Sequence, residues 1–372
     1  MTKAAELAKM GEVLTNSQIG GRRNIIINGA MQVAQRGTSA SSIQSGGYRT
    51  VDRFYFGTNG RDEGVYTNAQ VSDAPSGFSS SFKVTTTTAE SAIDANDLVW
   101  VAQRIEAQDL QQLKNGSSDA EKVTLSFYVK SSITGTFGVN LYKGQNTGRI
   151  INATYSISSA DTWEQKVITF DGDTSGGGID NDNGEGLRVV WHLASGSDFD
   201  SVNSTSWANY STTNWAGGHA QDGVITTTNA TWQLTGVQLE VGDFPNGTPF
   251  EHRSFGEELA LCQRYFTKFG GSTTYDLVGF GGTASSATNA QVGMVFPTQM
   301  RAIPSLTHND IEVADTVNSA VAVTSTAIGS TIHNNKTAWF NCNTSGSLTA
   351  LRPYYARVGN NSDGHVSFDS EL

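Results

Sequence analysis

One polar stretch carries the residues best suited to binding a ligand. Residues 206–221 place Trp207, Tyr210 and Trp215 among small polar residues, with no strand-like alternation. Aromatic rings in a polar loop can stack on the C–H faces of sugars, because each ring offers a broad apolar surface. We therefore predict carbohydrate binding through these three side chains. The alternative is that the rings plug onto the body of the domain and anchor the loop.

A second stretch, residues 171–186, is rich in carboxylates and could bind calcium through oxygen ligands. It does not fit the EF-hand loop. Counting from Asp180, the fifth position is Gly184 and the twelfth is Trp191, where Asp or Asn and then Glu are required. A solvated acidic hairpin is the favoured interpretation, and a structural calcium ion is left as the alternative. We predict no other cofactor and no metal-binding residue.

The chain shows no motif of an enzyme. The six histidines are scattered without metal-binding spacing, and we expect His192 to lie on the solvent face of its strand. Serine-hydrolase and P-loop patterns are missing, and no stretch marks the paired carboxylates of a glycosidase. The two cysteines, Cys262 and Cys342, are too few for a disulfide framework and lack zinc spacing. We predict a non-enzymatic protein without catalytic residues.

The charge of the chain limits its partners. With 24 Lys and Arg against 35 Asp and Glu, the formal net charge is −11, and no basic tract exceeds Arg22-Arg23. Proteins that bind phosphates need clusters of Lys and Arg, so we expect neither nucleic acid nor an anionic membrane surface as a partner. No apolar run approaches the ~20 residues that span a bilayer. Nothing near the N-terminus resembles a signal peptide, so we expect synthesis and solubility in a cytoplasm.

Alternation of apolar and polar residues predicts a run of β-strands over residues 24–250. These segments recur with Gly, Asn and Asp turns between them and without a long helix, which favours an antiparallel sandwich over parallel βαβ units. The clearest segment has one apolar and one polar face, the first made by Val123, Leu125, Phe127 and Val129 and the second by Thr124, Ser126, Tyr128 and Lys130.

Residues 231–266 lead from this β-domain into a second region. The strand pattern slips by one residue at Gly236, which predicts a β-bulge. From Ser254 the apolar spacing becomes helical, and Ser254 with Glu257 forms a capping-box pattern. The predicted organisation is an N-terminal segment with a short helix (1–23), a β-domain (24–250), a helical linker (251–266) and a second, smaller β-domain, expected to be a small sandwich (267–372).

Two blocks of the sequence resemble a module of tail-fibre and related virion proteins of tailed bacteriophages. One is TGVQLEVGDFPNGTPFEHRSFGEELALCQRYF, residues 235–266. The other is RNIIINGAMQVAQRGTS followed by YRTVDRFYF, residues 23–39 and 48–56. The order of strands between the blocks also resembles jelly-roll carbohydrate-binding modules. The resemblance implies a jelly-roll domain whose closing strand lies near its opening strand. In such modules Glu240 and Asn28 occupy places that often bind structural calcium.

The resemblance also implies a function. It indicates a virion structural protein, a tail-fibre or receptor-binding subunit that contacts host surface glycans. The N-terminal segment would attach it to other virion proteins, on the tail or another exterior appendage. A capsid fibre, a decoration protein and a tail adaptor are alternatives on the same module. A glycan-degrading enzyme of the particle and a free carbohydrate-binding module of a secreted bacterial enzyme are alternatives from other classes.

We predict a homo-oligomer, and the resemblance to fibre proteins indicates a trimer. The apolar stripe of Leu7, Met10 and Leu14 is too short to form a stable helix alone. The linker helix is apolar over much of its circumference and needs cover on more than one side. The mass of the intact chain, measured in solution at micromolar concentration, should be that of a trimer. A monomer would contradict the prediction.

Overall fold

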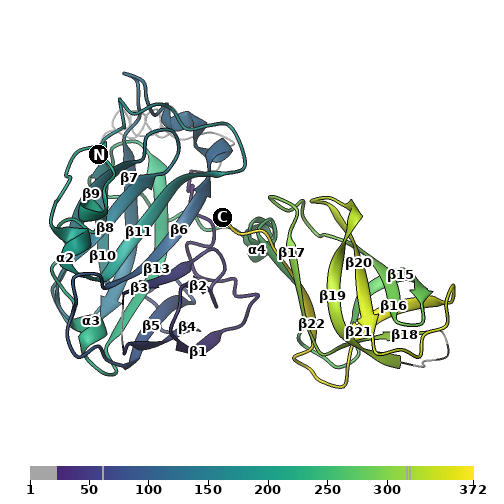
Figure 1. The fold of residues 1–372 in the computed structure, drawn as a ribbon. Coiled ribbons are helices and arrows are strands. Elements are labelled where there is room, and N and C mark those ends of the chain that lie inside the picture. The colour runs from purple at the N-terminus through teal and green to yellow at the C-terminus, as the bar shows by residue number, and fades with distance from the viewer. Residues whose placement is uncertain (1–22, 61–62, 316, 318–319) are drawn as a thin grey trace, which may run out of the picture. The chain divides into compact units, whose positions relative to one another are not determined.

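Antiparallel strands dominate the residues that the computed structural model describes, which are 23–60, 63–315, 317 and 320–372. They form two compact units, one ending at Phe255 and the other running from Gly256 to Glu371 (Figure 1). The prediction of a mainly β protein with an antiparallel sandwich and a second domain is confirmed. The predicted N-terminal helix lies outside the described residues. No helix in the described part of the chain is long and apolar enough to cross a membrane.

The first unit is a sandwich of two antiparallel sheets, sheet A and sheet B. Sheet A has the order β1 (Ser39–Ile43), β4 (Val65–Val71), β5 (Ser81–Thr88), β13 (Thr231–Val241), β7 (Val123–Ser131) and β10 (Glu164–Phe170). Sheet B has the order β12 (Ala208–Asn209), β9 (Arg149–Ile157), β8 (Gly135–Lys143), β11 (Glu185–Ser195), β6 (Leu98–Glu106), β3 (Tyr55–Asn59) and β2 (Gly47–Tyr48). Short helical turns connect strands, namely η1 (Ala107–Leu113), α2 (Ser197–Asp200), η2 (Thr212–Asn214) and α3 (Gly223–Thr226).

Aromatic side chains from both sheets fill the space between them. Phe127 of β7 meets Tyr155 of β9 at a ring-centroid distance of 5.1 Å and Trp191 of β11 at 5.8 Å, both edge to face. Trp232 of β13 is fully buried, and its indole N–H donates to the Tyr155 hydroxyl at 3.2 Å. Trp232 and Tyr155 thus satisfy each other inside the core, whereas the buried indole N–H of Trp191 has no hydrogen-bond partner among the described residues.

The closing strand lies beside the opening segment, as the sequence predicted. The Ile25 N–H donates to the Leu239 carbonyl at 2.9 Å, and the Val237 N–H donates to the Gly29 carbonyl at 2.9 Å. The predicted bulge in the closing strand is also present. Pairing of β13 with β7 shifts between Thr235 and Gln238, and Gly236 between them has φ +60°.

The second unit differs from the predicted small sandwich. Six of its strands close into a barrel in the order β15 (Leu277–Ser286), β16 (Asn289–Val295), β20 (Thr337–Thr344), β19 (Ala320–His333), β18 (Ile311–Ala314) and β21 (Pro353–Val358). A separate three-stranded sheet has the order β14 (Phe266–Gly270), β22 (His365–Asp369) and β17 (Ser305–Asn309). Closure pairs β15 with β21, so neither strand is left as an open edge, and alternation alone does not reveal it.

The predicted linker helix is present as α4 (Phe255–Gln263), but it ends before Phe266, which begins β14. Both cysteines are buried, and neither forms a disulfide with the other. Burial raises the pKa of the Cys342 thiol to about 12, so this group stays protonated and apolar at neutral pH.

The bulge glycine allows a direct test of strand geometry. At Gly236 a Cβ would lie 2.7 Å from the Phe78 ring and 2.9 Å from the Tyr128 ring, and the residue has φ +60°. Gly37 also has positive φ, +133°, but a Cβ there would meet nothing within 4 Å. We expect Gly37→Ala to cost about 1–2 kcal/mol of unfolding free energy through backbone strain. Gly236→Ala should cost about 1–3 kcal/mol more through overlap with the rings. Urea unfolding measures both variants, and an equal loss of unfolding free energy in Gly37→Ala and Gly236→Ala would contradict the role of the rings.

Candidate functional site

The outer face of sheet B carries a pocket of about 310 Å³. Trp100 of β6, Tyr142 of β8 and Arg188 of β11 face it from three neighbouring strands. They point outward because alternate residues on each strand fill the core, so the pleat leaves these side chains on the other face. Its lining residues are Thr58, Asn59, Leu98, Trp100, Tyr142, Arg188, Phe199, Tyr210 and Trp215.

Three rings meet at one end of the pocket. The Tyr142 and Tyr210 centroids lie 5.1 Å apart, Tyr142 and Trp215 lie 5.1 Å apart, and Tyr210 and Trp215 lie 5.6 Å apart, all edge to face. Tyr210 is 39% exposed, whereas Trp215 is only 7% exposed. Tyr210 therefore offers ring surface to a ligand, and Trp215 supports it from below.

Trp100 adds a flat apolar surface to the pocket. Its indole lies directly against Gly57 of β3, where any side chain would overlap the ring. Tyr55 of the same strand lies 6.3 Å from Trp100 between ring centroids. A glycine inside a strand often marks a close approach of this kind, and here it allows the indole to lie along the sheet.

Arg188 places a cation over the ring cluster. Its guanidinium carbon lies 5.6 Å from the Tyr142 centroid and 5.7 Å from the Trp215 centroid, within the range of a cation–π contact. Glu185 accepts two hydrogen bonds from this guanidinium, each 2.9 Å long. The Glu185 carboxylate also lies 3.3 Å from the Arg104 guanidinium, so it is shared between two cations. Burial raises the pKa of Tyr142, so its phenol stays protonated at neutral pH.

The segment after β11 covers the outer face of sheet B and buries His192. Trp215 from this segment packs against Leu98, Ala102, Ile150 and Val190. His192 is fully buried, 6.2 Å from the Trp215 ring, and its Nε2 lies 2.9 Å from the Asn140 amide nitrogen. The prediction that His192 faces solvent is wrong, because strand alternation cannot show that a distant loop covers the outer face. Burial lowers the His192 pKa well below its usual value, so the ring is neutral.

The structure brings together two of the three predicted sugar-binding rings. Tyr210 and Trp215 line the pocket, but Trp207 does not. The Trp207 indole donates to the Asp171 carbonyl at 2.6 Å, and its own carbonyl accepts from Arg149 at 3.0 Å. Trp207 thus fastens its loop to the end of β10, which corresponds to the anchoring alternative for this ring.

The acidic stretch 171–186 is not entirely a solvated hairpin. Asp173 is fully buried between Lys143 at 3.1 Å and Arg149 at 3.0 Å, and Lys143 is also fully buried. Asp180 and Asp182 are exposed. Hence one carboxylate of the stretch anchors it, because a buried charge needs partners of opposite sign. In the part of the chain that is described, no three His, Cys, Asp or Glu side chains gather as a metal site.

The two positions proposed for calcium belong to separate networks. Glu240 is fully buried, lies 3.1 Å from the Arg23 guanidinium, and accepts the Thr248 hydroxyl at 2.7 Å. The Asn28 amide donates to the carbonyls of Val33 at 2.8 Å and Asp52 at 3.0 Å. The Arg23 guanidinium therefore neutralises the Glu240 carboxylate, which would be the principal ligand of a calcium ion.

Sequence reasoning missed Trp100, Tyr142 and Arg188 as pocket residues. A signal was available for the two rings. Each is a large aromatic residue in the outward phase of a strand whose alternate residues are mostly apolar. An exposed ring at such a position indicates a binding surface more often than a core. Nothing in the sequence shows that β6, β8 and β11 are neighbours, so the cluster itself could not be predicted.

Comparison with known proteins gives distant structural similarities alone. No family model and no curated sequence matches the chain. The enzymatically active domain of tailspike protein 4 from bacteriophage CBA120 is 12% identical, with a TM-score of 0.31, over 59% of this chain and 21% of that one. A proposed sugar-binding protein from Bacteroides thetaiotaomicron is 13% identical, with a TM-score of 0.32, over 59% of this chain and 100% of that one.

A third similar structure is the family 11 carbohydrate-binding module from Clostridium thermocellum, in complex with a mixed-linked tetrasaccharide. It is 10% identical, with a TM-score of 0.29, over 56% of this chain and 98% of that one. This chain spans about a fifth of the tailspike domain and nearly the whole of the other two proteins. Similarities this distant do not identify a function.

The two pocket rings predicted from the sequence should respond differently to truncation. Trp215→Ala removes a nearly buried ring from a packed cluster and should lower the free energy of unfolding by about 3–5 kcal/mol. Tyr210→Ala removes a ring that is 39% exposed and should cost about 1 kcal/mol or less. Thermal and urea unfolding of the two variants measure this difference. A Trp215→Ala variant as stable as the parent would contradict an anchoring role.

Proposed function

We propose that the chain is a non-enzymatic glycan-binding protein, and that the pocket on sheet B is its binding site. The observation that carries the proposal is the convergence of Trp100, Tyr142 and Tyr210 on one pocket of about 310 Å³. Partly exposed rings from β6, from β8 and from the segment after β12 give apolar surface for the C–H faces of sugar rings. Thr58 and Asn59 at its rim supply a hydroxyl and an amide for sugar hydroxyls.

Charge favours a neutral glycan. The Arg188 guanidinium is paired with Glu185, and the whole chain has a formal net charge of −11. An acidic polysaccharide would be repelled by this charge unless cations bridge it. A neutral sugar gains stacking and hydrogen bonds without that penalty.

The binding should be weak at one site and strong for an assembly. A stacked ring contributes on the order of 1 kcal/mol, so a few rings and hydrogen bonds give a Kd near millimolar, about −4 kcal/mol. Several linked sites raise the effective affinity by orders of magnitude without new contacts. Weak single sites therefore suit a protein that is displayed in many copies.

We further propose that the chain is a virion structural protein of a tailed bacteriophage, a tail-fibre or receptor-binding subunit. The supporting observation is the resemblance of residues 23–39, 48–56 and 235–266 to such proteins. In this role the chain would be a homotrimer on the outside of the particle, held by its N-terminal segment to other virion proteins, with a host surface glycan as its ligand. A capsid fibre, a decoration protein or a tail adaptor is the alternative on the same resemblance.

Immobilised neutral and acidic bacterial polysaccharides, probed with the purified chain, test glycan binding. We expect neutral polysaccharides to retain the chain. The double change of Tyr142 and Tyr210 to Ala should weaken retention at least about tenfold while the fold is kept. Phe255→Ala, which removes an exposed ring outside the pocket, is the matched control. Equal retention of all three proteins would refute the assignment of the pocket.

The same mixtures test the alternative of a glycan-degrading enzyme. Incubation of the chain with a polysaccharide that binds it should release no new reducing ends over time. Timed release that is abolished by replacing one Asp or Glu would establish an enzyme and overturn the non-enzymatic assignment, because glycosidases act through paired carboxylates.

A further inference from the structure

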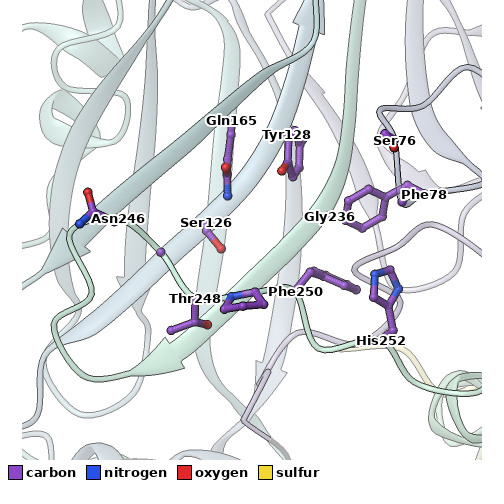
Figure 2. Close-up of a pocket in the computed structure, with 13 residues that line it drawn as sticks. Ser76, Phe78, Ser126, Tyr128, Gln165, Gly236, Asn246, Thr248, Phe250 and His252 are labelled. Atoms are coloured by element: carbon purple, nitrogen blue, oxygen red, sulfur yellow. The ribbon is translucent and has the colours of Figure 1, made fainter. Parts of the chain in front are cut away.

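A second pocket lies on the outer face of sheet A, on the opposite side of the sandwich from the first. Its volume is about 430 Å³. Strands β7, β10 and β13, the loop between β4 and β5 and the turn after β13 surround it (Figure 2). Ser126 and Tyr128 face it because Phe127 between them points into the core. All of its lining residues belong to the first unit.

One side of this pocket is aromatic. The Phe78 centroid lies 5.0 Å from that of Phe250 and 5.4 Å from that of His252, and the last two lie 4.8 Å apart. Tyr128 extends the cluster, 5.5 Å from Phe78. Phe78 and Phe250 are half-buried and His252 is exposed, so ring surface remains open at the pocket. This surface is suited to the apolar face of a sugar ring.

The glycine of the β13 bulge makes room for these rings. A Cβ at Gly236 would lie 2.7 Å from Phe78 and 2.9 Å from Tyr128, closer than packed atoms approach. The positive φ of +60° at this residue is also one that glycine adopts without strain. The bulge thus shapes the outer face of sheet A and lets the rings rest against its backbone.

The facing side carries hydrogen-bonding groups that the protein leaves unused. Figure 2 shows Gln165 and Ser126 on one side of the pocket, with Phe250 and His252 on the other. Within the described residues, the side chains of Ser126, Gln165 and Asn246 have no hydrogen-bond partner. An amide and a hydroxyl both donate and accept, which matches the mixed requirements of sugar hydroxyls.

No Asp, Glu, Lys or Arg is among the lining residues of this pocket. A charged ligand would lose hydration there without gaining a counter-charge, which is unfavourable. A purely apolar ligand would cover the amides without satisfying them, which is also unfavourable. The combination selects a neutral ligand with one apolar face and many hydroxyls.

We propose that this pocket is a second saccharide-binding site, which takes a neutral sugar between the rings of Phe78 and Phe250 and the polar groups of Ser126, Gln165 and Asn246. The two pockets open on opposite faces of one sandwich, so a single chain would hold two glycan strands together. This bridging role rests on the proposed function of the first pocket, whereas binding at the second pocket does not.

The two pockets can be followed separately in the intact chain. Trp100 and Trp215 line the first pocket, so tryptophan fluorescence reports on it. The second pocket has no tryptophan but includes His252, whose imidazole proton resonance can be assigned with His252→Gln. The probes are D-glucose, D-galactose and N-acetyl-D-glucosamine, each titrated to concentrations on the order of 10 mM or above, as a millimolar Kd requires. We expect at least one of them to shift the His252 resonance in a saturable manner.

Two variants and two matched controls test whether the shift of the His252 resonance comes from a sugar bound in the second pocket. Phe250→Ala and Gln165→Ala should each weaken the affinity read at His252 by about two- to tenfold and leave the fluorescence titration unchanged. Phe255→Ala removes a ring that is 57% exposed, and Gln112→Ala removes an amide on η1; neither residue lines either of the two pockets. Both controls should keep the parent affinity at His252. Melting temperatures of all four variants confirm that they are folded.

Three outcomes would overturn the proposal. The first is no shift of His252 with any of the three sugars. The second is a shift that Phe250→Ala and Gln165→Ala leave as strong as in the parent. The third is a tighter response to D-glucuronate than to any neutral sugar, which would contradict the neutral ligand. A silent fluorescence titration with a saturable His252 shift would refute the first pocket alone, so failures of the two sites are distinguishable.

Discussion

The packing of two sheets against one shared interior is the constraint on which the first unit depends. Phe127 of sheet A meets Tyr155 and Trp191 of sheet B edge to face, and the indole of Trp232 donates to the Tyr155 hydroxyl. Each strand must commit alternate side chains to this interior, since its residues point to opposite faces in turn. The side chains of the other phase point to the outer faces, where some of them line the two pockets together with loop residues such as Tyr210 and Phe250.

Each outer face uses a glycine to seat aromatic rings. On sheet B the indole of Trp100 lies against Gly57, and on sheet A the rings of Phe78 and Tyr128 lie against Gly236. A glycine inside a strand weakens the strand, because it loses more conformational freedom on folding and buries no side chain. Glycine is nevertheless present at these two positions, because a side chain there would hold the ring away from the sheet.

Long connections complete the pocket on sheet B, and buried charges hold them. Arg149 lies 3.0 Å from Asp173 and donates to the Trp207 carbonyl, so it joins the acidic segment after β10 to the aromatic segment after β11. Lys143 supplies a second cation to the same carboxylate. Removing one partner of such a cluster leaves an uncompensated buried charge, which is why the segments are held in one arrangement.

The sequence by itself determined the β class, most strand positions, the bulge at Gly236 and the helix that begins beside Ser254. These are local properties, set by alternation, by turn residues and by capping chemistry within a few residues. It also singled out Tyr210 and Trp215, which line one pocket. The tertiary structure alone decided that Trp207 anchors a loop, that His192 is covered, and that the second unit closes into a barrel. Each of these depends on which strands are neighbours, and strand order is set by packing between residues far apart in the chain, which no local pattern records.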